Sequence, residues 1–560
     1  MYNFYALIMD VWENVWMKLY PILWVMMTPI RWCVLCIIRI MRIMRIQTYQ
    51  TQYGDGSSFN IFGIFGKLFF ILFLAYSIVY LGLVAYVRIT HPIWSRLPAF
   101  HVYNLLRGWW WFPPGVLSFD YTSKEHTLYP PYSSWYQEDY IKYRVLRGEG
   151  IDEHHPETIR DVLSLLSRNY SSWNETELIY TPKKETFCST LAHPDSRMGI
   201  VYGDCLPSTR GLRPLIGCIT FHPLRGRYRR NQSKASATPV TTPKPITSTK
   251  DTWKALRVMY IDNLCIKRDS RGKGIFSKLC YTSIVRMMRD KDTQTYPIHL
   301  FKREGGHAGT SWKALGVIPA WQTVAYGTTL GRLKKVFQNR QGVKGFIDAK
   351  HAFQILPRSF RIQQANIQQI QDVFRRIQTR TIQPKSLLIT PEYSTLNAML
   401  NKNLWIHVLM DEVAHKAIAM YAWRLTEMMN REKEIKRKNG KNNTQEIPIL
   451  ELVASVWLGD TSTHPLYFSG FRESLGVCAK QLGHSDGKVF LYDCSDTTYI
   501  VHELFQNQYN EKTNNKKNEN ENGNNEFTGF TVFTEQCPIT WSWLGFAVPT
   551  IPKEQVVVIV

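Results

Sequence analysis

The stretch 258–288 constrains the fold of this chain more than any other part, and reads VMYIDNLCIKRDSRGKGIFSKLCYTSIVRMM. It begins with an apolar run typical of a β-strand and passes through a basic turn that contains Gly272 and Gly274. Apolar residues then recur every four positions, which predicts an α-helix. A helix start offers unpaired N–H groups and a positive dipole end, and glycines let the backbone approach an anion. This order of elements therefore indicates a phosphate-binding site.

The glycine pattern of the turn selects among the known phosphate-binding loops. The chain has neither the Gly-x-x-x-x-Gly-Lys-Ser/Thr loop nor the Gly-x-Gly-x-x-Gly fingerprint at this place. Residues 271–276 read Arg-Gly-Lys-Gly-Ile-Phe, which resembles the acyl-CoA pyrophosphate loop of the GNAT acyltransferases, Arg/Gln-x-x-Gly-x-Gly/Ala. Phe276 departs from that pattern at the last position. A basic turn on any protein surface supplies similar residues, so the six alone leave both interpretations open.

The strand before the turn makes the resemblance more specific. Residues 261–266 read Ile-Asp-Asn-Leu-Cys-Ile, and the turn starts at Arg271. This arrangement is similar to N-myristoyltransferase, which carries Ile-Asn-Phe-Leu-Cys-Val and then Arg-Ser-Lys-Arg-(Leu/Val)-Ala at the same spacing. The resemblance is patchy but ordered along nearly all of the chain after about residue 150. Shorter similar segments are Leu-Leu-Ser-Arg-Asn-Tyr at 165–170, the apolar strand 215–220, Leu-Pro-Arg at 356–358 and the apolar ending 553–560.

The resemblance implies an α/β fold of two fused GNAT-like halves with mixed sheets. The first half, 96–345, would bind acyl-CoA, and the second, 346–560, would lie on the peptide side. Independently, the order of predicted helices and strands recurs from about residue 353, which indicates an internal repeat of one βα unit. The second copy lacks the basic glycine turn, so at most one half should bind CoA. We expect a disordered insert at 223–252 and low-complexity inserts at 427–446 and 506–525.

The chemistry that the resemblance implies is attack of an N-terminal glycine amine on the thioester of acyl-CoA. Backbone N–H groups of Asn263 and Leu264 would stabilise the oxyanion, each by about 3 kcal/mol. The carboxylate of Val560 would accept the amine proton. Asp262 stands where the family has Asn, and is either a second candidate base or a bulge residue; we favour the bulge, because burying an unpaired charge is costly. The residues expected to hold acyl-CoA are Leu264, Cys265, Ile266, Arg271, Gly272, Lys273, Gly274, Ile275 and Phe276.

Departures from the family pattern keep other functions open. The acidic tract that follows Asn-Tyr in the family is reduced here to 171–175, the Gly-Asp-Gly turn near the C-terminus is missing, and 301–336 cannot be aligned. One alternative is an acyltransferase of the same fold that uses acetyl-CoA or another acyl-CoA on a different amine. The other is a catalytically degenerate, membrane-tethered interaction module.

Composition indicates an anionic partner. The chain has 560 residues and a net charge of +23, from 68 basic and 45 acidic side chains. Without a zinc finger or an RNP signature we expect no nucleic-acid partner; the charge suits CoA and a cytoplasmic membrane face. The 10 cysteines are scattered, which indicates a reduced protein without a metal site. Acyl-CoA, with myristoyl-CoA as the family's form, would be a co-substrate, and no cofactor would be permanently bound.

An uncharged run at 68–87 predicts a transmembrane helix, because twenty apolar residues cover about 30 Å of hydrocarbon. A second segment, 19–38, is either another span or an interfacial helix with its arginines on anionic lipid. We therefore expect 1–95 to anchor the protein in a membrane, with the catalytic domain facing the cytoplasm. The arginines at 39, 42 and 45 favour a cytoplasmic loop between the two segments. Whether the chain spans the membrane once or twice is left open.

Overall fold

The computed structural model describes most of the chain after residue 135. The chain divides into two compact units, Met1–Gly82 and Leu83–Val560, and all of the described strands lie in the second. The described residues are 72, 75, 78, 82, 115–116, 136–170, 178–204, 213–229, 253–304, 317–340, 356–380, 384–426, 428–430, 448–459, 464–482, 487–505, 532–544, 546–547 and 551–560.

The predicted membrane helix at 68–87 lies almost wholly outside these residues. Leu72, Ala75, Ile78 and Gly82 are described, and all four are helical. Among the residues that the structure describes, no helix combines the length and apolarity needed to cross a bilayer. Membrane anchoring stays a prediction.

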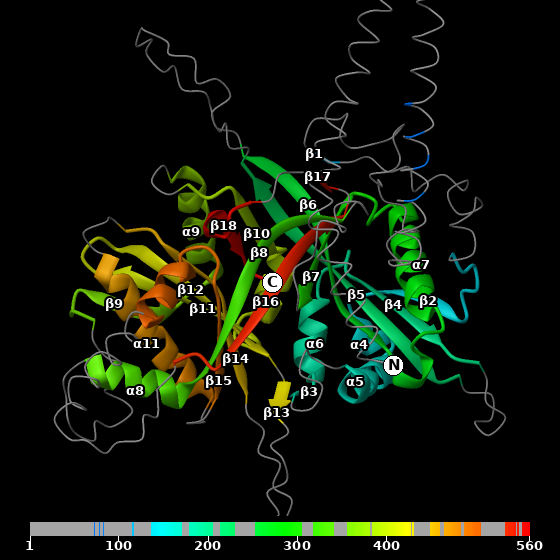
Figure 1. The fold of residues 1–560 in the computed structure, drawn as a ribbon, viewed down its shortest axis with the longest axis horizontal. Coiled ribbons are helices and arrows are strands. Elements are labelled where there is room, and N and C mark those ends of the chain that lie inside the picture. Colours follow the sequence, from blue (N-terminus) through cyan, green and yellow to red (C-terminus); the bar gives the residue numbers. More distant parts are fainter. Residues whose placement is uncertain are drawn as a thin grey trace, which may run out of the picture. The chain divides into compact units, whose positions relative to one another are not determined.

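The first half of the second unit is built on an antiparallel run of strands with one parallel addition. β5 pairs antiparallel with β4 and β6, β2 pairs with β4, and β7 joins β6 in parallel (Figure 1). The parallel pairing confirms the crossover expected for the helix between these two strands. The strands are β2 (Tyr143–Arg147), β4 (Arg197–Tyr202), β5 (Leu215–Tyr228), β6 (Lys254–Ile266) and β7 (Ile298–Glu304).

Two helices cover opposite faces of these strands. Cys218 of β5 lies in the apolar cluster under one helix, and its neighbour Ile219 lies in the cluster under the other. Adjacent strand residues point to opposite faces, so the two helices bury both sides of the sheet. The helices are α5 (Pro156–Asn169), with α4 (Ile151–His154) and α6 (Lys184–Thr190) nearby, and α7 (Ile275–Arg289).

The second half repeats the βα unit of the first. β14 and β15 are parallel and connected through α11, just as β6 and β7 are connected through α7. This confirms the internal repeat that the sequence predicts. The elements are β9 (Phe360–Gln364), α9 (Ile367–Thr379), β10 (Leu387–Pro391), α10 (Tyr393–Met399), β11 (Leu404–Asp411), β12 (Lys416–Thr426), β14 (Ile449–Trp457), α11 (His464–Leu482) and β15 (Lys488–Tyr492).

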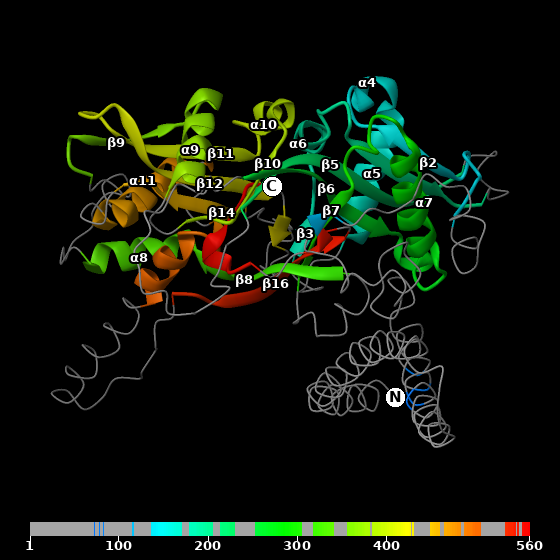
Figure 2. The ribbon, with the colours of Figure 1, turned by 90° about the horizontal axis from the view of Figure 1, so that it is seen from above.

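The halves exchange strands. β8 (Val317–Thr329), which α8 (Leu330–Arg340) follows, pairs with β15 of the second half, and β16 (Glu535–Leu544) pairs with β7 of the first. β8 and β16 also pair with each other, and lie side by side in both views (Figures 1 and 2). A sheet of 14 strands therefore runs through both halves. A short ribbon of β1 (Gly115–Val116) and β17 (Phe546–Ala547) is separate from it.

Two of the predicted inserts were drawn too long. β5 continues to Tyr228, because Leu224 and Gly226 alternate with exposed Arg225 and Arg227 and the strand pairs with the start of β6. Within 427–446, β13 (Met428–Asn430) is a strand that pairs with β3 (Leu178–Tyr180). Residues 230–252, 427, 431–446 and 506–525 lie outside the described residues.

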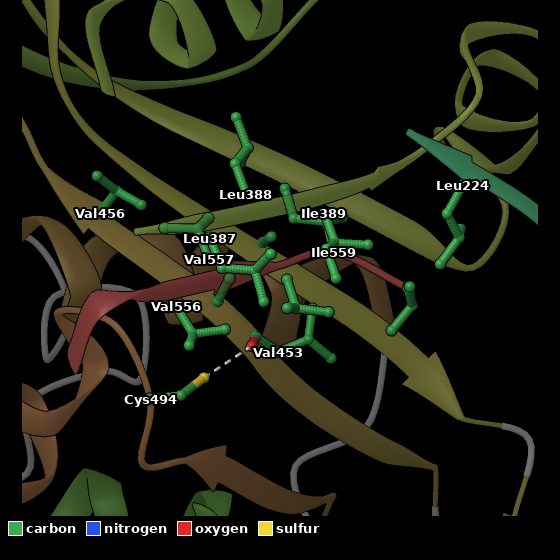
Figure 3. Close-up of a cluster of buried hydrophobic side chains, with 14 of the residues drawn as sticks. Leu224, Leu387, Leu388, Ile389, Val453, Val456, Cys494, Val556, Val557 and Ile559 are labelled. Carbon is green, nitrogen blue, oxygen red and sulfur yellow. Dashed lines mark hydrogen bonds between the residues drawn. The ribbon is translucent and has the colours of Figure 1, made fainter. Parts of the chain in front are cut away.

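The end of the chain is buried as a strand. β18 (Val556–Val558) follows a 3-10 turn, η7 (Lys553–Gln555), and pairs in parallel with β10. Figure 3 shows the cluster around the two strands, where Cys494 Sγ contacts the Val453 carbonyl at 3.6 Å. The apolar side chains labelled on β10, on β18 and directly after it are Leu387, Leu388, Ile389, Val556, Val557 and Ile559.

One buried ion pair fixes this end of the sheet. Lys385, just before β10, is 2% exposed and donates to Asp496 at 2.6 Å and to the Glu554 carbonyl at 2.8 Å. We expect Lys385→Met to lower the free energy of unfolding by about 3 kcal/mol in urea denaturation, because it removes one partner of a buried pair. Exposed Lys416 is the control, and its change to Met should cost less than about 0.5 kcal/mol. Equal effects of the two changes would contradict the assignment.

Candidate functional site

The candidate site lies where the pairing of β6 with β7 ends. β6 pairs with β7 only from Val258 to Ile261. On its other side, Thr220 faces Asp262 and Cys218 faces Cys265, so two residues of β6 lie opposite one residue of β5. This is a β-bulge, which leaves the extra residue outside the ladder. Asn263 and Leu264, the predicted oxyanion donors, form the bulge. The prediction that Asp262 is the bulge residue is wrong by one position, because Asp262 pairs with Thr220 and directly precedes the bulge.

Asn263 has a left-handed backbone conformation, with φ of 49°, and is 8% exposed. Asparagine adopts this region more readily than most residues. Its side chain is bonded at both ends: Nδ2 donates to Thr220 Oγ1 at 3.2 Å, and Oδ1 accepts from the Tyr180 hydroxyl at 3.3 Å. The bulge is therefore held by side chains of β3 and β5.

The glycine turn also has the predicted geometry. Gly272 and Gly274 have φ of 76° and 71°, and Gly274 is the N-cap of α7. It provides no side-chain cap, and the first turn of the helix carries no acidic residue. The N–H groups of this turn and the positive end of the helix dipole are thus available for an anion.

A cavity of about 400 Å³ extends from the turn to Leu264 of the bulge, whereas Asn263 is not part of its lining. This volume lies in the range of small-molecule sites, about 300–1,000 Å³. Its lining includes eight of the nine residues predicted to hold acyl-CoA; Lys273 is exposed at the edge of the turn and does not line it. The complete lining is Asn169, Tyr170, Leu264, Cys265, Ile266, Ser270, Arg271, Gly272, Gly274, Ile275 and Phe276.

Arg271 is engaged with the protein itself. Its Nε donates to the Ile266 carbonyl at 3.1 Å, and its Nη2 donates to the Asn169 carbonyl at 2.5 Å. The Arg268 N–H donates to Asn169 Oδ1 at 3.0 Å, so the end of α5 is bonded to both sides of η4 (Arg268–Ser270). Arg271 thus shapes the cavity wall in addition to bringing a positive charge to it.

Val560 lies away from the turn, among charged side chains of the second half. Its main-chain oxygen accepts from Arg424 Nη1 at 2.8 Å, and Arg424 Nη2 is 2.6 Å from Glu451. Burial would raise the pKa of Glu451, but Arg424 and Lys302 outweigh it and lower that pKa to about 2. Glu451 is therefore ionised and keeps Arg424 in place beside Val560.

Tyr260 interacts electrostatically with Asp262 next to the bulge and with Arg424 beside Val560. Burial and then the Asp262 carboxylate raise the pKa of the Tyr260 hydroxyl well above its usual value, and Arg424 opposes them. Burial also lowers the pKa of His222, which Asp262 opposes. Asp262 is half-buried and acts electrostatically on both Tyr260 and His222.

Several site residues were not found from the sequence. Asn169 and Tyr170 belong to the Leu-Leu-x-x-Asn-Tyr segment, so that motif was the available signal for this part of the cavity wall. Thr220, His222 and Tyr180 carried no signal, because their contacts join separate strands. Among the described residues, no group of three or more His, Cys, Asp or Glu side chains is placed to hold a metal ion.

The arrangement of strands and helices defines the structural class, which is a tandem GNAT fold of the N-myristoyltransferase kind. Saccharomyces cerevisiae N-myristoyltransferase with bound myristoyl-CoA has a similar structure, with a TM-score of 0.50, 11% identity, and coverage of 84% of this chain and 99% of that one. A structure of the same enzyme with myristoyl-CoA and inhibitors gives 0.51, 10%, 84% and 94%. At these identities the likeness shows the fold alone, and it confirms the fold that the motifs predict. No protein-family model matches the chain, and no curated protein sequence matches it.

The conformation of the turn gives a direct prediction. Gly274→Ala should lower the free energy of unfolding by about 1–2 kcal/mol, because a Cβ disfavours the left-handed region. The added atom itself meets nothing within 4 Å, so backbone conformation is the only cost. Gly274→Asn should cost less, and Gly331→Ala, in helical backbone with room for a Cβ, should cost nothing. Urea denaturation of the three variants measures the order; equal stability of Gly274→Ala and the parent would contradict it.

Proposed function

We propose that this protein is an acyl-CoA-dependent N-acyltransferase that moves a fatty acyl group to the N-terminal glycine amine of a protein. The observation that carries the proposal is the cavity, because one space touches both an anion-binding turn and a strand bulge. An enzyme that uses acyl-CoA needs these two features at a fixed separation: one holds the diphosphate, and the other holds the thioester carbonyl.

The turn would bind the CoA diphosphate mainly through backbone. N–H groups around Gly272 and at the start of α7 would donate to phosphate oxygens, since no side chain caps that helix. Lys273 is exposed at the edge of the turn and adds a positive charge. The half-buried Ile275 and Phe276 give the cavity an apolar wall beyond the phosphates.

The bulge would then act on the thioester. The amine nitrogen attacks the carbonyl carbon, and the carbonyl oxygen becomes an oxyanion that the Asn263 and Leu264 N–H groups stabilise. Collapse of this intermediate breaks the C–S bond, and the CoA thiolate leaves as the amide forms. Both donors belong to the main chain, so Asn263 can serve although the family has Phe there.

For the amine proton we propose the two acceptors that the sequence indicates, Val560 and Asp262. Asp262 is half-buried and directly precedes the bulge. The oxygen of Val560 is already bonded to Arg424, and a guanidinium stabilises a carboxylate in its charged form and so weakens it as a base.

We also propose that residues 1–95 anchor the protein in a membrane, with the acyltransferase facing the cytoplasm and its acyl-CoA.

Charge reversal at the turn tests CoA binding. Lys273→Glu should weaken myristoyl-CoA binding at least about tenfold in isothermal titration calorimetry, because an attraction to the diphosphate becomes a repulsion. Lys291→Glu makes the same change just past the other end of α7, and should change the affinity by less than about twofold. Equal losses would mean that the turn does not hold the phosphates. Binding of acetyl-CoA but not of myristoyl-CoA would favour the alternative acyl donor, and binding of neither would favour an interaction module.

The two candidate bases are separable by activity. If Asp262 accepts the proton, Asp262→Asn should lower kcat for transfer to a peptide with an N-terminal glycine about a hundredfold and leave acyl-CoA affinity unchanged. If a Val560 carboxylate does, adding residues after Val560 should have that effect instead. Steady-state kinetics with both variants assign the role. Unchanged kcat in both would exclude both groups.

A further inference from the structure

We infer that Thr220 and His222 are positioning residues that hold the Asn263 and Leu264 N–H groups in place for the thioester carbonyl. This inference rests on the acyl transfer proposed above. Neither side chain lines the cavity, so each would act through the bulge and not on the substrate.

The contacts form one chain beneath the bulge. His222 Nδ1 lies 2.8 Å from the Thr190 carbonyl, and His222 Nε2 lies 3.0 Å from Thr220 Oγ1. Thr220 Oγ1 accepts from Asn263 Nδ2, and Asn263 Oδ1 accepts from the Tyr180 hydroxyl. Thr220 is 0% exposed and His222 is 5% exposed, so water does not replace these partners.

The direction of every hydrogen bond in this chain is determined. A carbonyl oxygen only accepts, so His222 Nδ1 carries a proton. Burial keeps the ring neutral by lowering its pKa, and its Nε2 is therefore an acceptor. Thr220 must then donate its hydroxyl proton to His222, which leaves its lone pairs for Asn263 Nδ2. Because Nδ2 of Asn263 faces Thr220, its Oδ1 faces the Tyr180 hydroxyl. Each hydrogen bond in the chain then has one donor and one acceptor.

This orientation fixes the backbone as well as the side chain. Asn263 is held at a positive φ, a conformation that persists only where the surroundings enforce it. Its side-chain amide is bonded to β5 on one side and to β3 on the other. β3 in turn pairs with β13 of the second half. Removing the Thr220 hydroxyl would leave a buried Nδ2 without its acceptor and remove one of the two side-chain contacts that hold Asn263. A shift of φ and ψ at Asn263 out of the left-handed region would then move the adjoining peptide N–H groups.

The test compares Thr220→Val, which keeps the shape and loses the hydroxyl, with Thr220→Ser, which keeps the hydroxyl. Thr293→Val is the matched control, because Thr293 is 1% exposed and its hydroxyl donates to the Met287 carbonyl at 2.6 Å, outside this chain of contacts. The first readout needs no acceptor: the infrared C=O stretch of bound myristoyl-CoA labelled with ¹³C at the thioester carbon. The second readout is kcat for transfer to a peptide with an N-terminal glycine.

We expect the two bulge N–H groups to lower the C=O stretching frequency in the parent, in Thr220→Ser and in Thr293→Val. In Thr220→Val the shift should shrink and kcat should fall at least about tenfold, with the Kd for myristoyl-CoA unchanged, since loss of a full oxyanion donor costs about 10²–10³. A Thr220→Val variant with the parent's C=O shift and kcat would overturn the inference and leave the proposed function standing. Failure of the parent to bind myristoyl-CoA would overturn the proposed function, and the inference with it.

Discussion

Between Cys218 and Thr220, strand β5 has one residue, whereas its partner β6 has two. A ladder cannot pair an unequal number of residues, so β6 must place one outside it, and that residue takes a positive φ. Everything proposed for this protein's chemistry depends on that mismatch. It frees backbone donors in the middle of a strand, where the sheet would otherwise use them, at the point where β6 and β7 separate.

The rest of the sheet keeps that point rigid. β8 and β16 cross from one half to the other, so neither half completes its sheet from its own chain. Residues 556–558 are also held inside the structure: β18 pairs with β10, and Lys385 ties the start of β10 to the turn before β18. A bulge on one isolated hairpin could slip in register, whereas β6 is held by β5, β7 and the packing of helices on both faces.

The parts predicted from sequence are those where a local rule acts. Gly272 and Gly274 mark a left-handed turn, and the spacing between strand, turn and helix is set by short-range geometry, so the motif gave the cavity wall and the fold class. The resemblance assigned the proposed donors to Asn263 and Leu264, and the structure puts the bulge at these two residues and not at Asp262. The β8–β16 exchange and the Thr220–Asn263 contact join residues far apart in the chain, and no local pattern encodes them. The polar sequence that follows His222 concealed a strand, because Arg225 and Arg227 are exposed and bond to Glu392 and Gln378 while β6 pairs with the backbone.

Position 263 carries Asn where the N-myristoyltransferases carry Phe, and the proposed donors do not depend on this difference. The N–H groups at the bulge and turn belong to the backbone, and substitution changes them only by moving the chain. Asparagine favours the left-handed conformation that the bulge requires, but it introduces a buried amide with two donor hydrogens and two acceptor lone pairs. Thr220 accepts from the amide nitrogen, and Tyr180 donates to the amide oxygen. His222 determines this orientation, because it takes the Thr220 hydroxyl proton. Burial of a polar residue at this position therefore depends on the partners that β5 and β3 supply.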